Sequence, residues 1–444
     1  MVKPRPDLPS GPYLIVGLAR SGIAAALALR ARGEQVIGLD SGAPSGLQAL
    51  SDAGVELHLG ERGVELLEHA RTVVKSPGVP AQAPAIAQAR LRGMDVIGEL
   101  ELAWRLLPNE FVAVTATNGK TTTVELIGHI HREAGLEVAV AGNVGTALSG
   151  LDRRLDAGAI VVCEASSFQL EDTLEFAPEA AVLLNITPDH LDRHGTLDAY
   201  IAAKLQIFAR QGPEDVAVAP VGFPAEGLPG RAQRVSFGSD PGAHLTERDG
   251  TLYWQGQALL AVNELSLRGP HNLQNAMAAA AVCLARGLDV EAVRGGLRSF
   301  AGVPHRLEQV RRKGGVLFVN DSKATNVAST LVALEAMAAE HLPVHLILGG
   351  QGKAQDFTAL RVSVSAGARA VYLIGEDAAT IKQAIGEDRA EVHMCGDLDH
   401  ALSLAAAKAV HGEVVLLSPG CASFDQFADF EARGERFREL IQRL

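Results

Sequence analysis

The segment Thr115–Thr122, which reads Thr-Ala-Thr-Asn-Gly-Lys-Thr-Thr, has residue types suited to binding a polyphosphate. It follows the apolar run Phe111–Val114 and precedes a helical pattern, so backbone N–H groups and a helix N-terminus would face the phosphates. In such a loop Lys120 contacts the β- and γ-phosphates and the Thr121 hydroxyl binds Mg²⁺. Val114 stands where the standard spacing has a glycine, and a polar helix cap is the simpler alternative. We favour phosphate binding because the Lys-Thr pair lies between a strand and a helix.

Further polar residues follow predicted strands, at the sheet edge where α/β proteins bind ligands. Glu164 ends the run Val161–Cys163, and Mg²⁺ usually takes one or two carboxylates besides phosphate oxygens. A helix cap or a surface carboxylate explains Glu164 equally well. His190 lies in the polar loop Asn185–His194, whose two histidines and two aspartates suggest metal or phosphate contacts. From the residues alone, His190 and the helical Lys204 are more simply a structural histidine and a solvated lysine.

The elements that would position these residues alternate between short Val/Ile/Leu runs and Ala/Leu-rich helical patterns, which predicts an α/β protein with mainly parallel sheets. The first block has strands Tyr13–Val16 and Val36–Leu39, joined by a helix that ends at Arg32. It closes near Gly98, and the residues before Tyr13, Met1 to Pro12, are expected to form a short flexible lead-in.

The second block opens with the strand Phe111–Val114 and carries most of the chemical motifs. Its Gly/Pro-rich region Val221–Gly256 is expected to form turns and short antiparallel strands, an insertion before the Ala-rich helix Asn272–Arg286. A third block begins near Gly302 and repeats the strand–helix rhythm, with predicted strands at Val344–Leu348, Ala370–Ile374 and Val414–Leu417.

Composition bounds the class of protein. A chain of 444 residues is too long for one ordinary core, so two or three domains are expected. The net charge of -12 argues against nucleic acid as a partner. The four cysteines are scattered without metal-ligand spacing, which favours reduced thiols in a cytoplasmic protein. No stretch has the roughly 20 apolar residues of a membrane span, and the N-terminus does not resemble a signal peptide.

The order of the motifs resembles that of the Mur ligase family over nearly the whole chain. The matching segments are TATNGKTT (115–122), GNVG (142–145), EASSFQLE (164–171), NITPDHLDRH (185–194), YIAAK (200–204), HNLQNA (271–276), PHR (304–306) and NDSKATN (320–326). Together with GGQGK (349–353) and SPGCASFDQF (418–427), the last of these resembles the branch that adds D-glutamate. The Asp-Asn-Pro-Arg-type signature of the diaminopimelate- or lysine-adding branch is absent.

The resemblance implies three α/β domains: a Rossmann-like domain at 1–98 for the UDP-substrate, a central P-loop ATPase-like domain at 99–302 and a Rossmann-like amino-acid-binding domain at 303–444. It implies an ATP-dependent ligase that joins D-glutamate to UDP-N-acetylmuramoyl-L-alanine through an acyl phosphate, in peptidoglycan precursor synthesis. ATP and two Mg²⁺ ions are expected. We expect a cytoplasmic monomer whose partners are these small molecules.

The resemblance also assigns roles to single residues. For ATP it implies the loop residues Ala116, Thr117, Asn118, Gly119, Lys120, Thr121 and Thr122, with Asn275 for adenine, Asp321 for ribose and Arg306 for the phosphates. For Mg²⁺ it implies Thr121, Glu164, His190 and Lys204, the last as a carbamylated lysine. Lys120, His190, Lys204 and Arg306 would be catalytic. For the UDP-substrate it implies Ser21, Asp40, Ser76 and Gly78, for its muramoyl arm Asn143, Ser166 and Gln169, and for D-glutamate Lys323, Thr325, Lys353, Ser423 and Phe430.

Two positions depart from the family pattern. Ala116 stands where the family has a glycine, and one methyl group is tolerable if φ there is negative. The segment after Asp40 lacks the basic residue that some relatives have beside the nucleotide, and Arg20 is our hypothesis for its replacement.

Three other functions are alternatives for this sequence. Gly17-x-Ala19-x-x-Gly22 followed by Asp40 is a degenerate dinucleotide fingerprint, which would suit a nicotinamide-dependent oxidoreductase. A folylpolyglutamate synthetase-like ligase of the same superfamily is a closer alternative, and a non-catalytic ATP-binding module is the third. The phosphate loop has no role in hydride transfer, and the SPGCASFDQF segment favours the D-glutamate-adding branch.

Overall fold

The computed structural model describes residues 3–143, 145–151, 155–223, 227–267, 269–352, 355–386 and 390–444. The chain divides into two compact units between Phe300 and Ala301. The first unit contains two β-sheets and the second contains one. Within the described residues, no helix is both long and apolar enough to cross a membrane.

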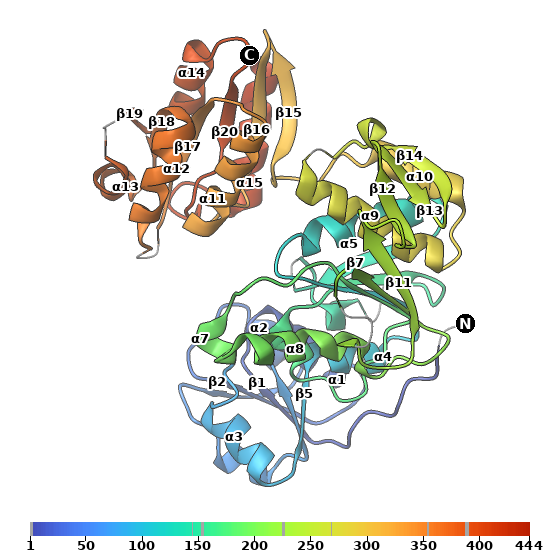
Figure 1. Cartoon of the computed structure of the whole chain (residues 1–444). Helices are drawn as coiled ribbons and strands as arrows, with labels where there is room; N and C mark the ends of the chain where they lie inside the picture. Colours follow the sequence, from blue (N-terminus) through green and yellow to red (C-terminus); the bar gives the residue numbers. More distant parts are fainter. Residues whose placement is uncertain are drawn as a thin grey trace. The chain divides into compact units, whose positions relative to one another are not determined.

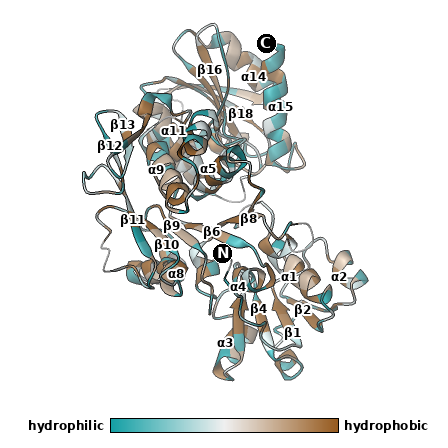
Figure 2. Ribbon diagram, turned by 90° about the vertical axis from the view of Figure 1, so that its right-hand side faces the viewer, coloured by the Kyte–Doolittle hydropathy of each residue, from teal (hydrophilic) through white to brown (hydrophobic). Residues whose placement is uncertain are grey.

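The first sheet has five parallel strands in the order β3-β2-β1-β4-β5. Strands β1, β2 and β5 are labelled in Figure 1. The strands are β1 (Tyr13–Val16), β2 (Val36–Asp40), β3 (Glu56–Leu59), β4 (Thr72–Lys75) and β5 (Asp95–Gly98), with helices α1 (Arg20–Arg30), α2 (Gln48–Asp52) and α3 (Pro84–Leu91). Successive side chains of β1 enter two different cores: Tyr13 and Ile15 pack in one, Leu14 and Val16 in the other. A strand that is apolar at every position therefore becomes the buried centre of a covered sheet, coloured hydrophobic in Figure 2.

The residues before β1 are held against the first unit, so the prediction of a flexible lead-in was wrong for the described residues 3–12. Arg5 donates from Nη1 to Glu179 Oε1 at 2.9 Å, and its guanidinium carbon lies 4.7 Å from the centre of the Trp104 ring. Lys3 pairs with Asp215 at 2.8 Å. These partners lie far along the chain, and only folding brings them to the N-terminal segment.

We expect Arg5→Ala to lower the free energy of unfolding by about 3 kcal/mol, because it leaves the buried Glu179 carboxylate without its cation. The Arg5 side chain is 7% exposed and that of Glu179 is 2% exposed. Urea unfolding followed by tryptophan fluorescence measures the change. Arg298→Ala is the control, since its pair with Glu264 is exposed to solvent and should contribute little to the free energy of unfolding. Equal effects of the two variants would contradict the prediction.

The second sheet has nine strands in the order β14-β13-β12-β11-β10-β9-β6-β8-β7. They are β6 (Glu110–Thr115), β7 (Val138–Gly142), β8 (Ile160–Glu164), β9 (Ala180–Leu183), β10 (Val216–Pro220), β11 (Gln233–Gly238), β12 (Leu245–Arg248), β13 (Thr251–Trp254) and β14 (Gln257–Ala261). The expected antiparallel insertion is only partly correct. Strand β11 pairs in parallel with β10 and β12, and only β12–β13–β14 is antiparallel, so the region extends the sheet.

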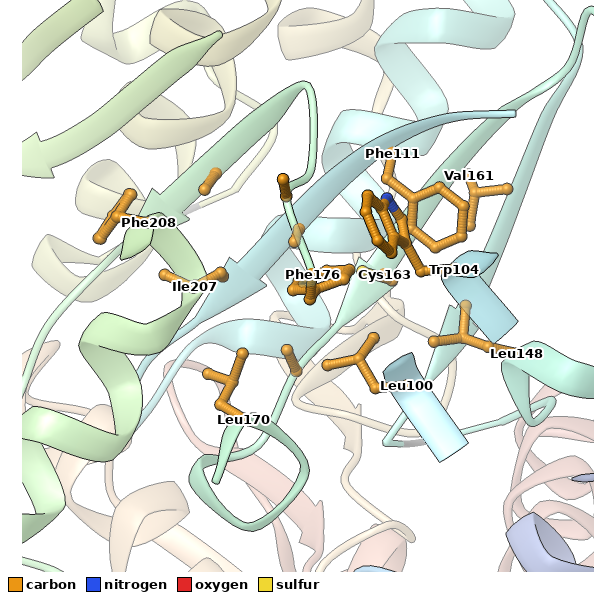
Figure 3. Packing of buried hydrophobic residues seen from close by; sticks show 14 of the residues in the cluster. Leu100, Trp104, Phe111, Leu148, Val161, Cys163, Leu170, Phe176, Ile207 and Phe208 are labelled. Atoms are coloured by element: carbon orange, nitrogen blue, oxygen red, sulfur yellow. The ribbon is translucent and has the colours of Figure 1, made fainter. Parts of the chain in front are cut away.

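The helices of this part of the first unit are α4 (Glu99–Leu106), α5 (Lys120–Glu133), α6 (Ser167–Leu170), α7 (Leu191–His194), α8 (Leu197–Ala209), α9 (Pro270–Ala285) and α10 (Val290–Ser299). Figure 3 shows the packing of Trp104 and Leu100 from α4 with Phe111 of β6, Val161 of β8 and Phe176. The Trp104 and Phe176 rings meet edge-on at 5.8 Å. This core joins α4, which directly follows the first sheet, to the second sheet.

The second unit is built on a six-stranded sheet in the order β15-β16-β20-β17-β18-β19. Its strands are β15 (Glu308–Lys313), β16 (Val316–Asn320), β17 (Val344–Gly349), β18 (Ala368–Ile374), β19 (Glu391–Gly396) and β20 (Val414–Leu417), and only the edge strand β15 is antiparallel. Its helices are α11 (Val327–Ala339), α12 (Leu360–Gly367), α13 (Ala378–Ile385), α14 (Leu398–Lys408) and α15 (Phe430–Arg443). Buried side chains form a core on each face of the sheet. Helix α15 is mostly hydrophilic in Figure 2, as expected of a surface helix with one buried stripe.

Candidate functional site

The predicted phosphate loop lies between β6 and α5, as the sequence indicated. Gly119 precedes the first helical residue with φ +87°, and a Cβ atom there would collide with Asn275 Oδ1 of α9. Only glycine fits this left-handed position beside another chain segment. Asn118 donates its backbone N–H to Asn185 Oδ1 at 3.0 Å, which ties the loop to the segment after β9. Ala116 has no positive φ, so the backbone accommodates its methyl group.

Two lysines converge on one carbonyl group of this loop. Lys120 Nζ and Lys204 Nζ each donate to Ala116 O at 2.7 Å, and Lys120 also donates to Thr117 O at 2.9 Å. Lys204 is 1% exposed, so it is not the solvated helical lysine that its position in α8 first indicated. Burial and the adjacent Lys120 lower the pKa of Lys204 to about 7.

Glu164 ends β8 as a buried carboxylate that accepts hydrogen bonds from two neutral side chains. Thr121 Oγ1 donates to Glu164 Oε2 at 2.8 Å, and Asn143 Nδ2 donates to Oε1 at 3.0 Å. A buried carboxylate next to a threonine hydroxyl fits the oxygen ligand set of Mg²⁺.

His190 is brought to the same part of the site through an aromatic neighbour. It is the N-cap residue of α7 with φ +51°, and its ring centre lies 6.3 Å from that of Tyr200. Lys204 Nζ lies 4.6 Å from the centre of the Tyr200 ring. The Tyr200 hydroxyl is 3.1 Å from Thr117 Oγ1 in the phosphate loop. Tyr200 therefore links His190, Lys204 and the loop.

A cavity of about 460 Å³ opens at the carboxyl ends of β1, β2 and β4, where the strand order of the first sheet reverses. Its lining includes the predicted Ser21, Asp40, Ser76, Gly78, Asn143 and Gln169, together with Arg20, the cavity's one cationic residue among those described. Asp40 accepts from the backbone N–H groups of Leu18 and Gly42 at 2.7 and 2.8 Å, so its carboxylate shapes the loops around the cavity.

Ser166 and Gln169 form a reciprocal cap at the start of α6. The Gln169 backbone N–H donates to Ser166 Oγ at 3.2 Å, and Gln169 Oε1 accepts from the Ser166 backbone N–H at 3.0 Å. This capping box fixes both side chains directly after Glu164. The prediction that they face a ligand stays a prediction, although Gln169 lines the cavity.

In the second unit, the predicted residues lie on loops at the carboxyl ends of β16 and β20. Asp321 follows β16 and accepts from Ser418 Oγ at 2.8 Å and from the Leu307 backbone N–H at 3.1 Å. Lys323 Nζ lies 6.0 Å from the ring centre of Phe430, the first residue of α15. Ser423 is buried, and Thr325 and Arg306 are partly exposed. Lys353 lies outside the described residues.

Asp321 is 5% exposed, and burial raises the pKa of its carboxyl group to about 7. The folded state thus binds a proton that the unfolded state releases near pH 4, and the stability of the second unit falls as pH rises from about 4 to 7. Asp321→Asn keeps a neutral group there, so we expect it to raise the free energy of unfolding at pH 8 by about 2 kcal/mol.

Hydrogen exchange of β16 and β20 is followed in increasing urea for the variant and the wild type, at pH 5 and at pH 8. The urea concentration at which these strands lose half of their protection reports the stability of the second unit. The difference in the free energy of unfolding between Asp321→Asn and the wild type should be larger at pH 8 than at pH 5. Glu340→Gln, at an exposed residue, should change stability by less than about 0.5 kcal/mol at both pH values. A difference that narrows as pH rises would contradict the raised pKa.

Several residues of the site were not singled out from the sequence. Tyr200 lies beside His190, and Arg193 and His194 pack on the Phe168 ring that also contacts His190. Arg433 is buried in the second unit, where Nη2 donates to the carbonyls of Ser322 and Cys421. Spacing within their motifs did not distinguish them from packing residues. A larger cavity of about 730 Å³ lies at the amino ends of β6 and β8, away from the phosphate loop. Glu110, His131 and Arg286 are among the described residues that line it, and none of these lining residues is a predicted site residue.

Comparison with family models matches each of the three sheets to a different domain model. Residues 12–98 match the model described as Mur ligase MurD-like, N-terminal domain, residues 114–283 the Mur ligase middle domain, and residues 305–421 the Mur ligase, glutamate ligase domain. The chain belongs to the Mur ligase family. This membership confirms the resemblance and the expected three-domain α/β fold of a Mur ligase.

Curated Mur ligases cover the chain almost completely. The UDP-N-acetylmuramoylalanine–D-glutamate ligase of Anaeromyxobacter dehalogenans is 43% identical over 458 residues, 98% of each chain. The ligase of the same name from Acidobacterium capsulatum is 40% identical over 457 residues, 98% of this chain and 97% of the relative.

Solved Mur ligases share the fold at lower identity. UDP-N-acetylmuramate–alanine ligase MurC from Thermotoga maritima has a TM-score of 0.59 at 19% identity, covering 98% of this chain and 100% of that one. A MurF from Acinetobacter baumannii has a TM-score of 0.59 at 18% identity, covering 96% and 93%. At these identities the likeness extends to the fold.

Proposed function

We propose that this Mur ligase joins D-glutamate to UDP-N-acetylmuramoyl-L-alanine with the consumption of ATP, in peptidoglycan precursor synthesis. The observation that carries the proposal is the identity of about 40% over nearly the full length to ligases named for this reaction. The phosphate loop, the buried Glu164 and the cavity with Arg20 supply matching chemistry in the described residues.

The reaction proceeds in two steps. A carboxylate oxygen of the alanine residue attacks the γ-phosphorus of ATP, which forms an acyl phosphate and releases ADP. The neutral amine of D-glutamate then attacks the acyl carbon, and the tetrahedral intermediate expels inorganic phosphate as the amide forms; the amine gives up a proton. Both steps build negative charge on oxygen atoms, so preset cations lower the barrier.

The residues of the first unit would act on the phosphates. Lys120 would hold the β- and γ-phosphates once it leaves the Ala116 and Thr117 carbonyls, and Gly119 allows the loop to approach them. Glu164 and Thr121 would hold one Mg²⁺, and His190 with carbamylated Lys204 a second. The ions supply charge compensation at the transferring phosphoryl group. Asn275 would contact the adenine.

The remaining predicted residues would bind the substrates. Arg20 and the N-terminus of α1 would face the diphosphate of the UDP-substrate, while Asn143, Ser166 and Gln169 would face its muramoyl arm. In the second unit, Arg306 is proposed for the phosphates and Asp321 for the ribose. Thr325, Ser423 and Phe430, with Lys323 and Lys353, would bind the two carboxylates of D-glutamate.

Phosphate release from ATP tests the function, measured with UDP-N-acetylmuramoyl-L-alanine and a panel of D- and L-amino acids. We expect phosphate release that requires both the UDP-substrate and D-glutamate, together with formation of the amide product. Turnover with L-glutamate and a folate would instead support the folylpolyglutamate synthetase-like alternative. Nucleotide binding without amide formation under any condition would indicate a non-catalytic module.

A further inference from the structure

Arg193 lies three residues after His190 and joins α7 to the first sheet. Its Nη1 donates to Pro77 O and its Nη2 to Val79 O, both at 3.1 Å. These two carbonyls flank Gly78 in the loop after β4, and all three loop residues line the 460 Å³ cavity. The guanidinium therefore fixes one wall of the cavity that we propose for the UDP-substrate.

The other side of Arg193 rests on an aromatic stack that includes His190. The guanidinium carbon lies 4.3 Å from the centre of the Phe168 ring, and that ring lies 4.9 Å from the ring of His190. Phe168 also stacks on His194 at 5.3 Å with an interplanar angle of 16°. One planar cation thus contacts both the cavity wall and the ring that supports His190.

The far end of the stack is anchored in the segment after Glu164. His194 Nε2 lies 3.0 Å from Ser167 Oγ, and His194 Nδ1 lies 2.9 Å from a Glu171 carboxylate oxygen. Because the His194 side chain is 1% exposed and held at both ring nitrogens, the stack has little freedom to absorb a shift of Arg193. A displacement of the cavity wall would therefore reach His190.

We propose that Arg193 is a positioning residue that couples binding of the UDP-substrate to binding of Mg²⁺–ATP. A UDP-substrate in the cavity holds residues 77–79 in place, Arg193 holds Phe168, and Phe168 holds His190 at the proposed metal site. Each ligand then strengthens the binding of the other, since coupling between sites is reciprocal. Lysine replaces arginine only in part here, because it keeps the positive charge but lacks the two-pronged donor and the flat face. The inference rests on the proposed function.

The test measures the Kd of UDP-N-acetylmuramoyl-L-alanine by calorimetry, without and with a non-hydrolysable ATP analogue and Mg²⁺. We expect the analogue to lower this Kd at least about fivefold in the wild type. In Arg193→Ala the ratio of the two Kd values should fall to about 1, while both ligands still bind separately. Arg193→Lys should give a ratio between these values.

Arg210→Ala is the matched control, because this exposed arginine also donates to a backbone carbonyl, that of Leu174, at 3.0 Å, and does not line the cavity. It should keep the wild-type ratio. An unchanged ratio in Arg193→Ala, or a wild-type ratio of 1, would overturn the coupling and leave the proposed function intact. Failure of the wild type to bind the UDP-substrate at all would overturn the function itself.

Discussion

Lys120→Ala is expected to lower kcat about 100-fold or more and to leave the Kd of the UDP-substrate within about threefold of the wild type. The lost ammonium group faces charge that develops on the transferring phosphoryl group, where one preset donor contributes that much. Lys120 already lies over the loop, with Nζ 2.7 Å from Ala116 O and 2.9 Å from Thr117 O. The cavity for the UDP-substrate is lined by other residues, so binding there does not need Lys120.

Phosphate release and calorimetry separate the two effects. Lys408→Ala is the control, since its ion pair with Glu391 is a surface contact and its loss should leave kcat unchanged. If Lys120→Ala released phosphate at a near-normal rate, Thr115–Thr122 would not be the ATP-binding loop. A large loss of UDP-substrate binding would show that the variant disturbs the first unit as a whole.

The parts of the site that the sequence predicted are those whose chemistry lies in contiguous residues at strand ends. Asn118, Gly119 and Lys120 follow one apolar run and Glu164 ends another, and parallel strands bring such ends to a common edge. Pairing of β6 with β8 places Thr121 against Glu164, although 43 residues separate them. Alternating strands and helices therefore predict a site once each strand end is known.

The parts that the sequence could not predict depend on side chains meeting across long separations. Arg5 finds Glu179 at a separation of 174 residues, and Arg193 finds Pro77 at a separation of 116. No local sequence pattern indicates such long-range pairs. The parallel pairing of β10 with β11 was also hidden, because the Gly/Pro-rich segment between them has the composition of a hairpin region.

The structure changes the interpretation of Lys204. A lysine four residues after Tyr200 in a helix is by itself an unremarkable surface cation, yet its ammonium group is buried and shares the Ala116 carbonyl with Lys120. Two like charges on one carbonyl, away from water, disfavour protonation, in line with the pKa of about 7. A large share of Lys204 is then the neutral amine that can react with CO₂.

We expect Lys204 to be carbamylated in the working enzyme. The neutral amine nitrogen attacks the carbon of CO₂ and gives up one proton, so the neutral side chain becomes an anion. Starting from the ammonium form, two protons are released in all. The product has carboxylate oxygens of the type that Mg²⁺ prefers, and its charge complements that of Lys120. Unmodified, the ammonium group would repel the metal ion that His190 is proposed to hold.

Lys204→Ala should therefore lower kcat about 100-fold or more, and a short-chain carboxylic acid added to the assay should restore part of the activity by occupying the vacated ligand position. The same acid should not raise the activity of Lys120→Ala, because that variant lacks a cation. Mass spectrometry of active wild-type enzyme, after chemical trapping of the carbamate, should find the modification on Lys204. Wild-type turnover by Lys204→Ala, or an unmodified amine in fully active enzyme, would show that the second metal site is not built on this lysine.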